Sequence, residues 1–209
     1  MKRIVKSKEP QVLADFKKEY REKQKVDATY NDMTYSIKNK IKSILSEEQS
    51  FICCYCMKRI KPHNSHIEHI KPQARFPDES LDYHNLLVSC NGMDDTNENC
   101  GHKKDNWYDA RDFLVPLDPD CEKIFTYSIT GKIDASQKRG QITITKLNLN
   151  SLQLVRARKA VIGLSGLFDS DFEQRKQEII SYNATPNSDN VLPPFCMAVI
   201  YCISHYSKL

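Results

Sequence analysis

Long apolar runs are missing from this 209-residue sequence. No segment approaches the roughly 20 consecutive apolar residues that a membrane span requires, and the basic first residues are not followed by the apolar core of a signal peptide. No repeat or low-complexity tract is present, and only six glycines and nine prolines interrupt the chain. The sequence therefore predicts a cytoplasmic protein that is neither secreted nor embedded in a membrane.

The overall composition excludes further classes of protein. Hydrophobic residues make up 40% and charged residues 28% of the chain, which is ordinary for a globular fold and excludes a collagen-like or wholly disordered chain. A chain of this length can bury a core without disulfides. The 31 basic and 27 acidic residues give a net charge of +4, which permits a nucleic-acid partner without requiring one.

Cysteine and histidine are concentrated in one part of the chain. Five of the eight cysteines and five of the six histidines lie within residues 51–110. In an intracellular chain of this size, such cysteines indicate metal ligands and buried thiols rather than disulfides. This concentration divides the sequence into a helical N-terminal extension, a chemically distinctive core and a C-terminal region, at residues 1–50, 51–110 and 111–209.

The N-terminal extension is predicted to be helical. Apolar residues at helical spacing predict helices over residues 10–25 and 34–45. Residues 46–49, Ser-Glu-Glu-Gln, resemble a capping box that starts a further short helical turn.

Beyond residue 110, the pattern changes to strands followed by helices, so the predicted fold class is α+β. Alternating apolar and polar residues predict strands at 125–129 and 141–145. Capping signals predict helices that start at Asn150 and Ser170, and a last apolar helix follows Pro194. This region shows no catalytic signature, which favours a packing or docking role.

Cys53 and Cys56 form a C-x-x-C pair, the spacing at which a tight turn lets two thiolates bind one tetrahedral zinc ion. Cys90 and Cys100 are the natural candidates to complete the site. Cys54 cannot bind beside both neighbours without distorting the turn, so we expect it to be a bystander. A buried or redox-active pair is the alternative, but the further Cys and His downstream favour structural zinc. The other cysteines are expected to be small buried hydrophobes: Cys121, Cys196 and Cys202.

Polar residues suited to catalysis follow in order through the same segment. His66 and Glu68 share one face of a predicted strand, with His69 on the other face or at its end. Asn85 precedes a second apolar strand that leads to the third zinc cysteine, and His102 follows the fourth in a segment able to start a helix. Singly, each is most simply a polar group that makes a hydrogen bond. The ordered set is far more specific.

This set resembles the HNH endonuclease family, whose ββα-metal fold carries an acidic–His pair, a middle Asn and a final metal-binding His or Asn. The matching residues are Glu68, His69, Asn85 and His102. Most of the chain is also similar to retron-associated and Septu-type HNH nucleases of anti-phage defence, through residues 46–53, 66–72, 85–91, 100–104 and 147–150. The resemblance implies a zinc-framed ββα-metal nuclease core at 51–110, and a PtuA-like ATPase as partner, with the C-terminal region as the docking candidate.

Phosphodiester hydrolysis suggests a role for each matched residue. We expect His69 to be the general base, because histidine titrates near neutrality, with its other ring nitrogen held by the Asn85 side chain or by the backbone of that loop. Glu68 and His102 are the expected protein ligands of a catalytic divalent ion, Mg²⁺ or Mn²⁺, and a histidine ligand leaves room for the latter. His66 is a further ligand, an outer group or a satisfied structural histidine.

Two departures from the generic HNH pattern affect His102. Nine residues separate the third and fourth cysteines, and Gly101 stands between the fourth cysteine and His102. Asn106, predicted to lie one turn further along the helix, is the alternative ligand. Lys103 and Lys104 are predicted to open this helix, where the dipole favours phosphate, and to contact nucleic acid. The alternative is that both lysines are ordinary solvated cations.

These observations predict a metal-dependent HNH endonuclease that cuts nucleic acid, with DNA favoured as substrate. One alternative is a zinc-ribbon module that binds nucleic acid without catalysis, which does not explain the order of the polar residues. Another is a scaffold for the ATPase, which could coexist with nuclease activity.

Overall fold

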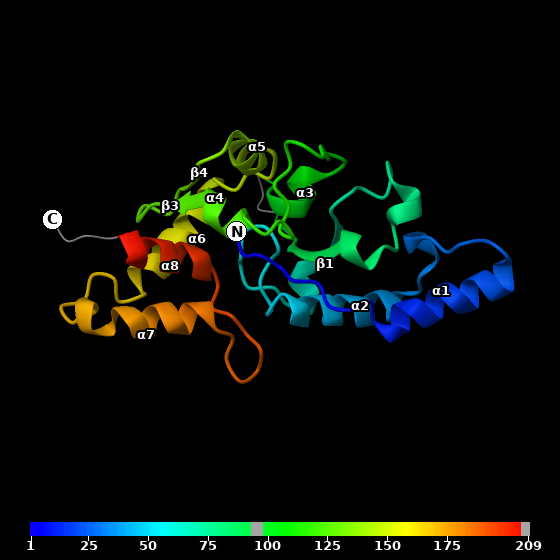
Figure 1. Cartoon of the computed structure of the whole chain (residues 1–209), viewed down its shortest axis with the longest axis horizontal. Helices are drawn as coiled ribbons and strands as arrows, with labels where there is room; N and C mark the ends of the chain where they lie inside the picture. The colour runs from blue at the N-terminus through cyan, green and yellow to red at the C-terminus, as the bar shows by residue number, and fades with distance from the viewer. Residues whose placement is uncertain (93–97, 206–209) are drawn as a thin grey trace.

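The computed structural model describes residues 1–92 and 98–205, and within them the chain is an α+β protein. Helices carry most of the secondary structure, and two antiparallel sheets of two strands each complete it. The molecule is elongated (Figure 1), with α1 (Gln11–Gln24) near one end, α7 (Phe172–Ala184) near the other, and β1 (Ser65–His69) and α3 (Cys100–Lys104) between them. The predicted α+β class is confirmed.

The N-terminal extension forms two helices that contact each other. α1 buries Leu13, and α2 (Tyr35–Glu48) buries Ile41 and Leu45 and also contacts β2 (Leu86–Cys90). α2 begins after Thr34, whose side chain accepts a hydrogen bond from the third backbone N–H of the helix. The predicted capping box at residues 46–49 is wrong. The helix that begins after Thr34 continues through Glu48, so this segment ends a helix instead of starting one.

The core of the chain consists of a hairpin followed by a short helix. β1 and β2 pair antiparallel, with Ser65 opposite Cys90 and His69 opposite Leu86. Every residue of β2 is buried, which agrees with its nearly continuous apolar sequence. The residues between the strands form two short 3-10 turns at Pro77–Glu79 and Tyr83–Asn85. α3 contacts β2, so strand, strand and helix follow in the order of a ββα unit.

The C-terminal region begins with α4 (Cys121–Ile124) and a hairpin of β3 (Phe125–Tyr127) and β4 (Ile133–Ala135). Four helices follow: α5 (Lys138–Lys146), α6 (Leu152–Gly163), α7 and α8 (Cys196–His205). α8 contacts α6, α7 and β3. Within the described residues, none of the helices combines the length and apolar character needed to cross a membrane.

The predicted strand at 141–145 is wrong, because this segment lies within helix α5. Gly140, Thr143 and Ile144 are its buried residues, at the i, i+3 and i+4 positions of one helical face. The Thr143 hydroxyl donates to the Arg139 carbonyl and accepts from the Leu114 N–H. The β-branched residues and their alternation favour a strand, but the segment forms a helix because its buried residues lie on one helical face.

The helix predicted to start at Asn150 starts one residue later, after Ser151. The Asn150 side chain instead bonds both the N–H and the carbonyl of Ile133, at 3.0 and 2.8 Å, and so joins β4 to the start of α6. Buried apolar residues from all three predicted segments form one contiguous core.

Candidate functional site

Four cysteines lie close together: two from the C-x-x-C turn, one from the end of β2 and one from the start of α3. The sulfur atoms of Cys53, Cys56, Cys90 and Cys100 all lie within 4.8 Å of one another, and all four residues are buried. The Cys56 and Cys90 sulfurs are 3.7 Å apart. Tetrahedral zinc with Zn–S bonds of about 2.3 Å places its sulfurs about 3.8 Å apart. The four thiols therefore fit a metal ion, and zinc is the ion whose ligand chemistry they match.

The backbone around the cysteines is arranged to bring their sulfur atoms together. Met57, with φ 65°, reverses the chain after Cys56, and its N–H bonds the Cys53 carbonyl. Backbone N–H groups also point at two sulfurs: Lys58 N lies 3.4 Å from the Cys56 sulfur, and Cys90 N lies 3.3 Å from the Cys53 sulfur. Such donors orient and stabilise metal-bound thiolates.

The other cysteines lie outside this group of four. Cys54 is buried next to it, and burial together with the neighbouring Cys53 raises the pKa of its thiol well above the ordinary value. Cys121 and Cys202 are buried, and burial raises the pKa of each to about 11. Cys196 is also buried. These thiols are neutral near pH 7 and pack as small apolar groups, as predicted.

Glu68 is the most densely contacted polar residue of β1. It is 5% exposed, and its Oε1 accepts a hydrogen bond from the Tyr55 hydroxyl at 3.0 Å and an ion pair from the Lys104 ammonium at 2.9 Å. Its Oε2 lies 3.4 Å from His66 Nε2. Burial alone would raise the pKa of Glu68, but the contacts with His66 and Lys104 outweigh it and keep this pKa below the ordinary value. The carboxylate is therefore charged at neutral pH.

Two histidines flank this carboxylate. His66 and Glu68 share one face of β1, as predicted, and the His66 ring lies 4.7 Å from the His102 ring, centroid to centroid. His66 Nδ1 is 3.5 Å from the Asn91 side-chain oxygen. Burial lowers the pKa of His102, as does the charge of His66. β1 and α3 thus place the Glu68 carboxylate and the His102 ring against His66, although among the described residues only the four cysteines have ligand atoms that all lie within 4.8 Å of one another.

His69 ends β1 and is nearly buried. Its Nε2 lies 3.1 Å from the Ser80 carbonyl, and the Tyr30 ring packs edge-on at 4.7 Å between centroids. Since a carbonyl only accepts, Nε2 carries the proton and Nδ1 is the basic nitrogen. Burial lowers the pKa of His69, partly opposed by the bond to Ser80. The imidazole is therefore neutral at working pH.

Asn85 is buried within the loop that connects the two strands. Its side-chain oxygen accepts from the Lys71 N–H at 2.7 Å, and its amide donates to the Lys71 and Glu79 carbonyls at 3.0 Å each. The prediction that the Asn85 side chain holds the His69 ring is therefore wrong, because this side chain bonds backbone groups of the loop. The loop backbone, at Ser80, is what holds the His69 ring.

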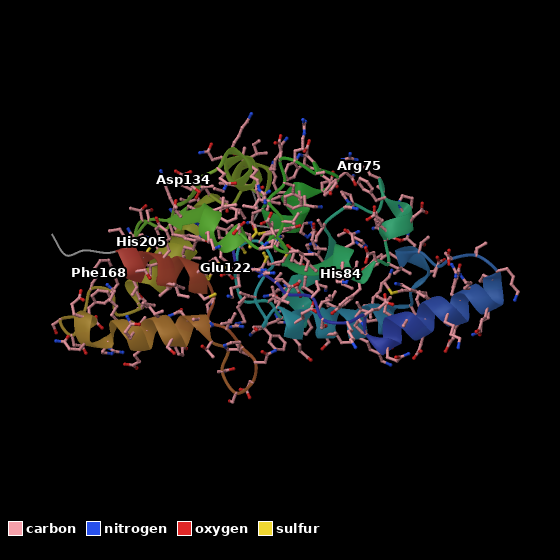
Figure 2. The ribbon with its side chains drawn as sticks, in the orientation of Figure 1. Arg75, His84, Glu122, Asp134, Phe168 and His205 are labelled. Carbon is pink, nitrogen blue, oxygen red and sulfur yellow. The ribbon has the colours of Figure 1, made fainter. Side chains whose placement is uncertain are left out.

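The predicted placement of the basic residues needs correction. α3 ends at Lys104, so Lys103 and Lys104 lie in its last turn and do not open it. Lys103 is exposed, whereas Lys104 is 3% exposed and is paired with Glu68. Asp105 leaves the helix with φ 45°, so the alternative ligand Asn106 is not on its face. Arg75 (Figure 2) donates to the carbonyls of residues 106 and 108 and ties the loop to the segment after α3.

Sequence reasoning missed three residues of this site. Tyr55 lies inside the C-x-x-C pair, whose spacing predicts metal ligands but gives no role to the residues between the cysteines. Ser89, fully buried on β2, accepts the Gly101 N–H at 3.1 Å and lies 3.7 Å from the Cys53 sulfur. Ser80 belongs to a loop without any motif. Ser89 is marked only by its position next to the third cysteine, and nothing local marks Ser80.

Comparisons with known proteins concern the chain as a whole. No family model matches the chain. A predicted HNH endonuclease of retron Vc95 from Vibrio cholerae serotype O1 biovar El Tor is 31% identical, over 60% of this chain and 65% of that protein. A predicted HNH endonuclease of retron Ec83 from Escherichia coli is 27% identical, over 78% and 79%. Septu protein PtuB from Bacillus thuringiensis is 26% identical, over 59% and 46%.

The coverage of these relatives is uneven. The chain spans just under two thirds of the length of the Vc95 protein and less than half of PtuB, while it spans 79% of the Ec83 protein. The resemblance seen in the sequence is nevertheless confirmed by all three matches. This chain is similar to the HNH endonucleases named in two retron systems and to the Septu protein PtuB.

Proposed function

We propose that this protein is a metal-dependent HNH endonuclease that hydrolyses phosphodiester bonds of nucleic acid, with DNA as the favoured substrate. In this proposal it acts in anti-phage defence as the nuclease subunit of a complex with a PtuA-like ATPase. The observation that carries the proposal is that β1 and α3 place the Glu68 carboxylate and the His102 ring against the same residue, His66, while a neutral His69 follows Glu68 in β1. Its core, residues 51–110, is then a ββα-metal unit framed by structural zinc.

The general base in this mechanism is His69. With Nε2 held by the Ser80 carbonyl, Nδ1 accepts the proton of the attacking water. The low pKa caused by burial keeps this nitrogen free of a proton near neutral pH. Asn85 would position His69 indirectly, because its three hydrogen bonds to backbone fix the loop that carries Ser80.

Glu68 and His102 would hold the catalytic divalent ion, and His66 lies close enough to the carboxylate to assist. The buried, charged carboxylate and the neighbouring imidazoles form a mixed oxygen and nitrogen donor set, which suits Mn²⁺ at least as well as Mg²⁺. Such an ion supplies Lewis-acid stabilisation of the phosphate and of the leaving oxygen.

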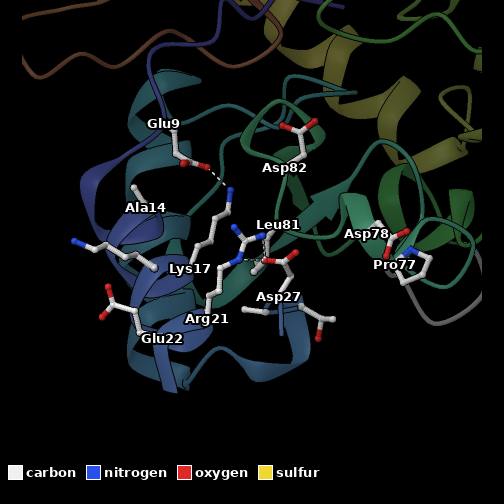
Figure 3. A pocket seen from close by; sticks show the side chains of 13 residues that line it. Glu9, Ala14, Lys17, Arg21, Glu22, Asp27, Pro77, Asp78, Leu81 and Asp82 are labelled. Atoms are coloured by element: carbon white, nitrogen blue, oxygen red, sulfur yellow. Dashed lines mark hydrogen bonds and ion pairs between the residues drawn. The ribbon is translucent and has the colours of Figure 1, made fainter. Parts of the chain in front are cut away.

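The nucleic acid would approach over α3. Lys103 is exposed on this helix and would contact phosphate. Lys104 would not, because it is buried and ion-paired with Glu68. A hollow of about 820 Å³ between α1 and the loop at 77–82 is a poor candidate for phosphate (Figure 3). Two of its three cations, Lys17 and Arg21, are ion-paired with Glu9 and Asp27, and further acidic residues line it.

The ATPase is proposed to dock on the C-terminal region, residues 111–209. Among the large apolar side chains exposed there, Leu164, Phe168 and Tyr182 lie on or between α6 and α7 and are 88%, 53% and 68% exposed. Two of them, Leu164 and Tyr182, line a hollow of about 750 Å³ between α6, α7 and α8. Exposed apolar groups gathered at one site support a protein interface.

The decisive experiment compares His69→Ala with the wild type on DNA and on RNA, with Mg²⁺ or Mn²⁺, alone and with the co-expressed ATPase. We expect cleavage to fall by roughly 100-fold or more, because the general base is lost. His84→Ala is the control, since His84 is an exposed histidine of the loop that follows β1. Undiminished cutting by His69→Ala refutes the mechanism. A wild type that binds nucleic acid but never cuts it supports the alternative, a zinc-ribbon binding or scaffold subunit.

A further inference from the structure

The two oxygens of the Glu68 carboxylate have different surroundings. Oε1 is held by two buried donors, the Tyr55 hydroxyl at 3.0 Å and the Lys104 ammonium at 2.9 Å. Oε2 instead faces the imidazole of His66, at 3.4 Å from Nε2. Two fixed donors on one oxygen leave the other to serve as a ligand, with the carboxylate plane already set.

The donors of Oε1 come from the two halves of the four-cysteine centre. Tyr55 lies inside the C-x-x-C turn, immediately before Cys56, and is 1% exposed. Lys104 lies on α3, the helix that begins with Cys100. Both side chains are therefore anchored by backbone that the zinc cysteines hold in place.

We propose that Tyr55 is a positioning residue for the catalytic ion: its hydroxyl, together with Lys104, fixes Glu68 Oε1 so that Oε2 faces the ion. This inference rests on the proposed function, since it takes Glu68 to be a metal ligand. It assigns the four-cysteine centre a second task besides stabilising the fold. Groups that hydrogen-bond to metal ligands in this way commonly contribute 10–100-fold to metal affinity or activity.

The chain offers a matched control in a second network of the same three residue types. Glu48 is half-buried, accepts a hydrogen bond from the Tyr83 hydroxyl at 2.9 Å and two more from Ser7, and is paired with Lys6 at 2.6 Å. Tyr83 is 2% exposed, much like Tyr55. Tyr83→Phe therefore removes the same kind of bond as Tyr55→Phe, but at a carboxylate that binds no ion in this proposal.

The test is Mn²⁺ binding to the zinc-loaded full-length protein, measured by the loss of the free Mn²⁺ signal in electron paramagnetic resonance. We expect Tyr55→Phe to weaken binding about 10-fold, and Tyr83→Phe to leave it within about 2-fold. In cleavage assays, Tyr55→Phe should raise the Mn²⁺ concentration needed for half-maximal rate by a similar factor. Zinc content, measured in parallel, should stay the same in all three proteins.

Several results would overturn the proposal. Equal Mn²⁺ affinity of the two Tyr→Phe variants would show that the Tyr55 hydroxyl does not position a ligand. Loss of zinc from Tyr55→Phe alone would show that the phenol serves the cysteines and not Glu68. A wild type that binds no Mn²⁺ would remove the ion to be positioned. By contrast, a wild type that binds Mn²⁺ but cuts nothing refutes the proposed function and leaves the positioning role standing.

Discussion

Replacing neighbouring cysteines offers a sharp test of the metal centre, because Cys53 and Cys54 differ in role but hardly in environment. Both are buried, at 1% and 2% exposure, and they are adjacent in sequence. Only the Cys53 sulfur belongs to the group of four that lies within 4.8 Å. Cys53→Ala and Cys54→Ala thus remove the same atom from the same layer of the core, and only the first removes a metal ligand.

The expected effects differ several-fold. Structural zinc contributes about 10–16 kcal/mol to the folding of zinc-finger peptides, so an equal share for each of four thiolates is about 3–4 kcal/mol. A chain of this size loses about 2–4 °C of Tm for each kcal/mol. Cys53→Ala should therefore lower Tm by roughly 6–16 °C. Cys54→Ala loses one small buried group, worth about 1 kcal/mol, and should lower Tm by about 2–4 °C.

The assay combines zinc content by elemental analysis with thermal unfolding of the purified variants. We expect about one zinc ion per chain in the wild type and in Cys54→Ala, and clearly less in Cys53→Ala. Adding excess Zn²⁺ should raise the Tm of the wild type and of Cys54→Ala more than that of Cys53→Ala. Equal zinc content and equal Tm in the two variants would refute the assignment of the cluster, as would a wild type without metal.

Three further predictions concern other parts of the structure. Gly101→Ala should abolish cleavage with zinc retained, as measured by activity and metal content, because its Cβ would lie 2.3 Å from Glu68 Oε2. Asn85→Ala should cost roughly 2–3 kcal/mol, seen in denaturant unfolding, since it leaves buried backbone groups unpaired. Glu48→Gln should cost about 1–3 kcal/mol at neutral pH, because it removes the charge that pairs with the half-buried Lys6. The contact with Lys6 keeps the pKa of Glu48 below its ordinary value despite burial, so this difference should shrink as pH falls through that pKa.

The chemistry of the site was predictable because it depends on short, ordered spacings. The C-x-x-C pair can reach one ion whatever surrounds it, and alternation along a strand places His66 and Glu68 on one face in any register. Both features are local. The pairing of β1 with the largely apolar β2 then brings the third cysteine beside the first two.

The predictions that failed concern residues whose structure depends on contacts with segments distant in the sequence. Residues 141–145 alternate like a strand, yet they form a helix because Gly140, Thr143 and Ile144 fit one buried face. The sequence predicts nucleic-acid contact for both Lys103 and Lys104, but α3 exposes Lys103 and turns Lys104 inward onto Glu68. The carbonyl that holds His69 belongs to Ser80, a residue that no pattern distinguishes.

Gly101 shows how a departure from a family pattern can be a fitted feature of the site. Its position between the fourth cysteine and His102 seems at first to weaken the assignment of His102. In the structure, a side chain at this position would lie 2.3 Å from Glu68 Oε2 and 2.6 Å from His66 Nε2. The absence of a side chain therefore lets α3 pack directly against the His66–Glu68 pair and bring His102 to it. The same close approach places Lys104 on Glu68, so one glycine allows both the histidine and the lysine of α3 to reach the carboxylate.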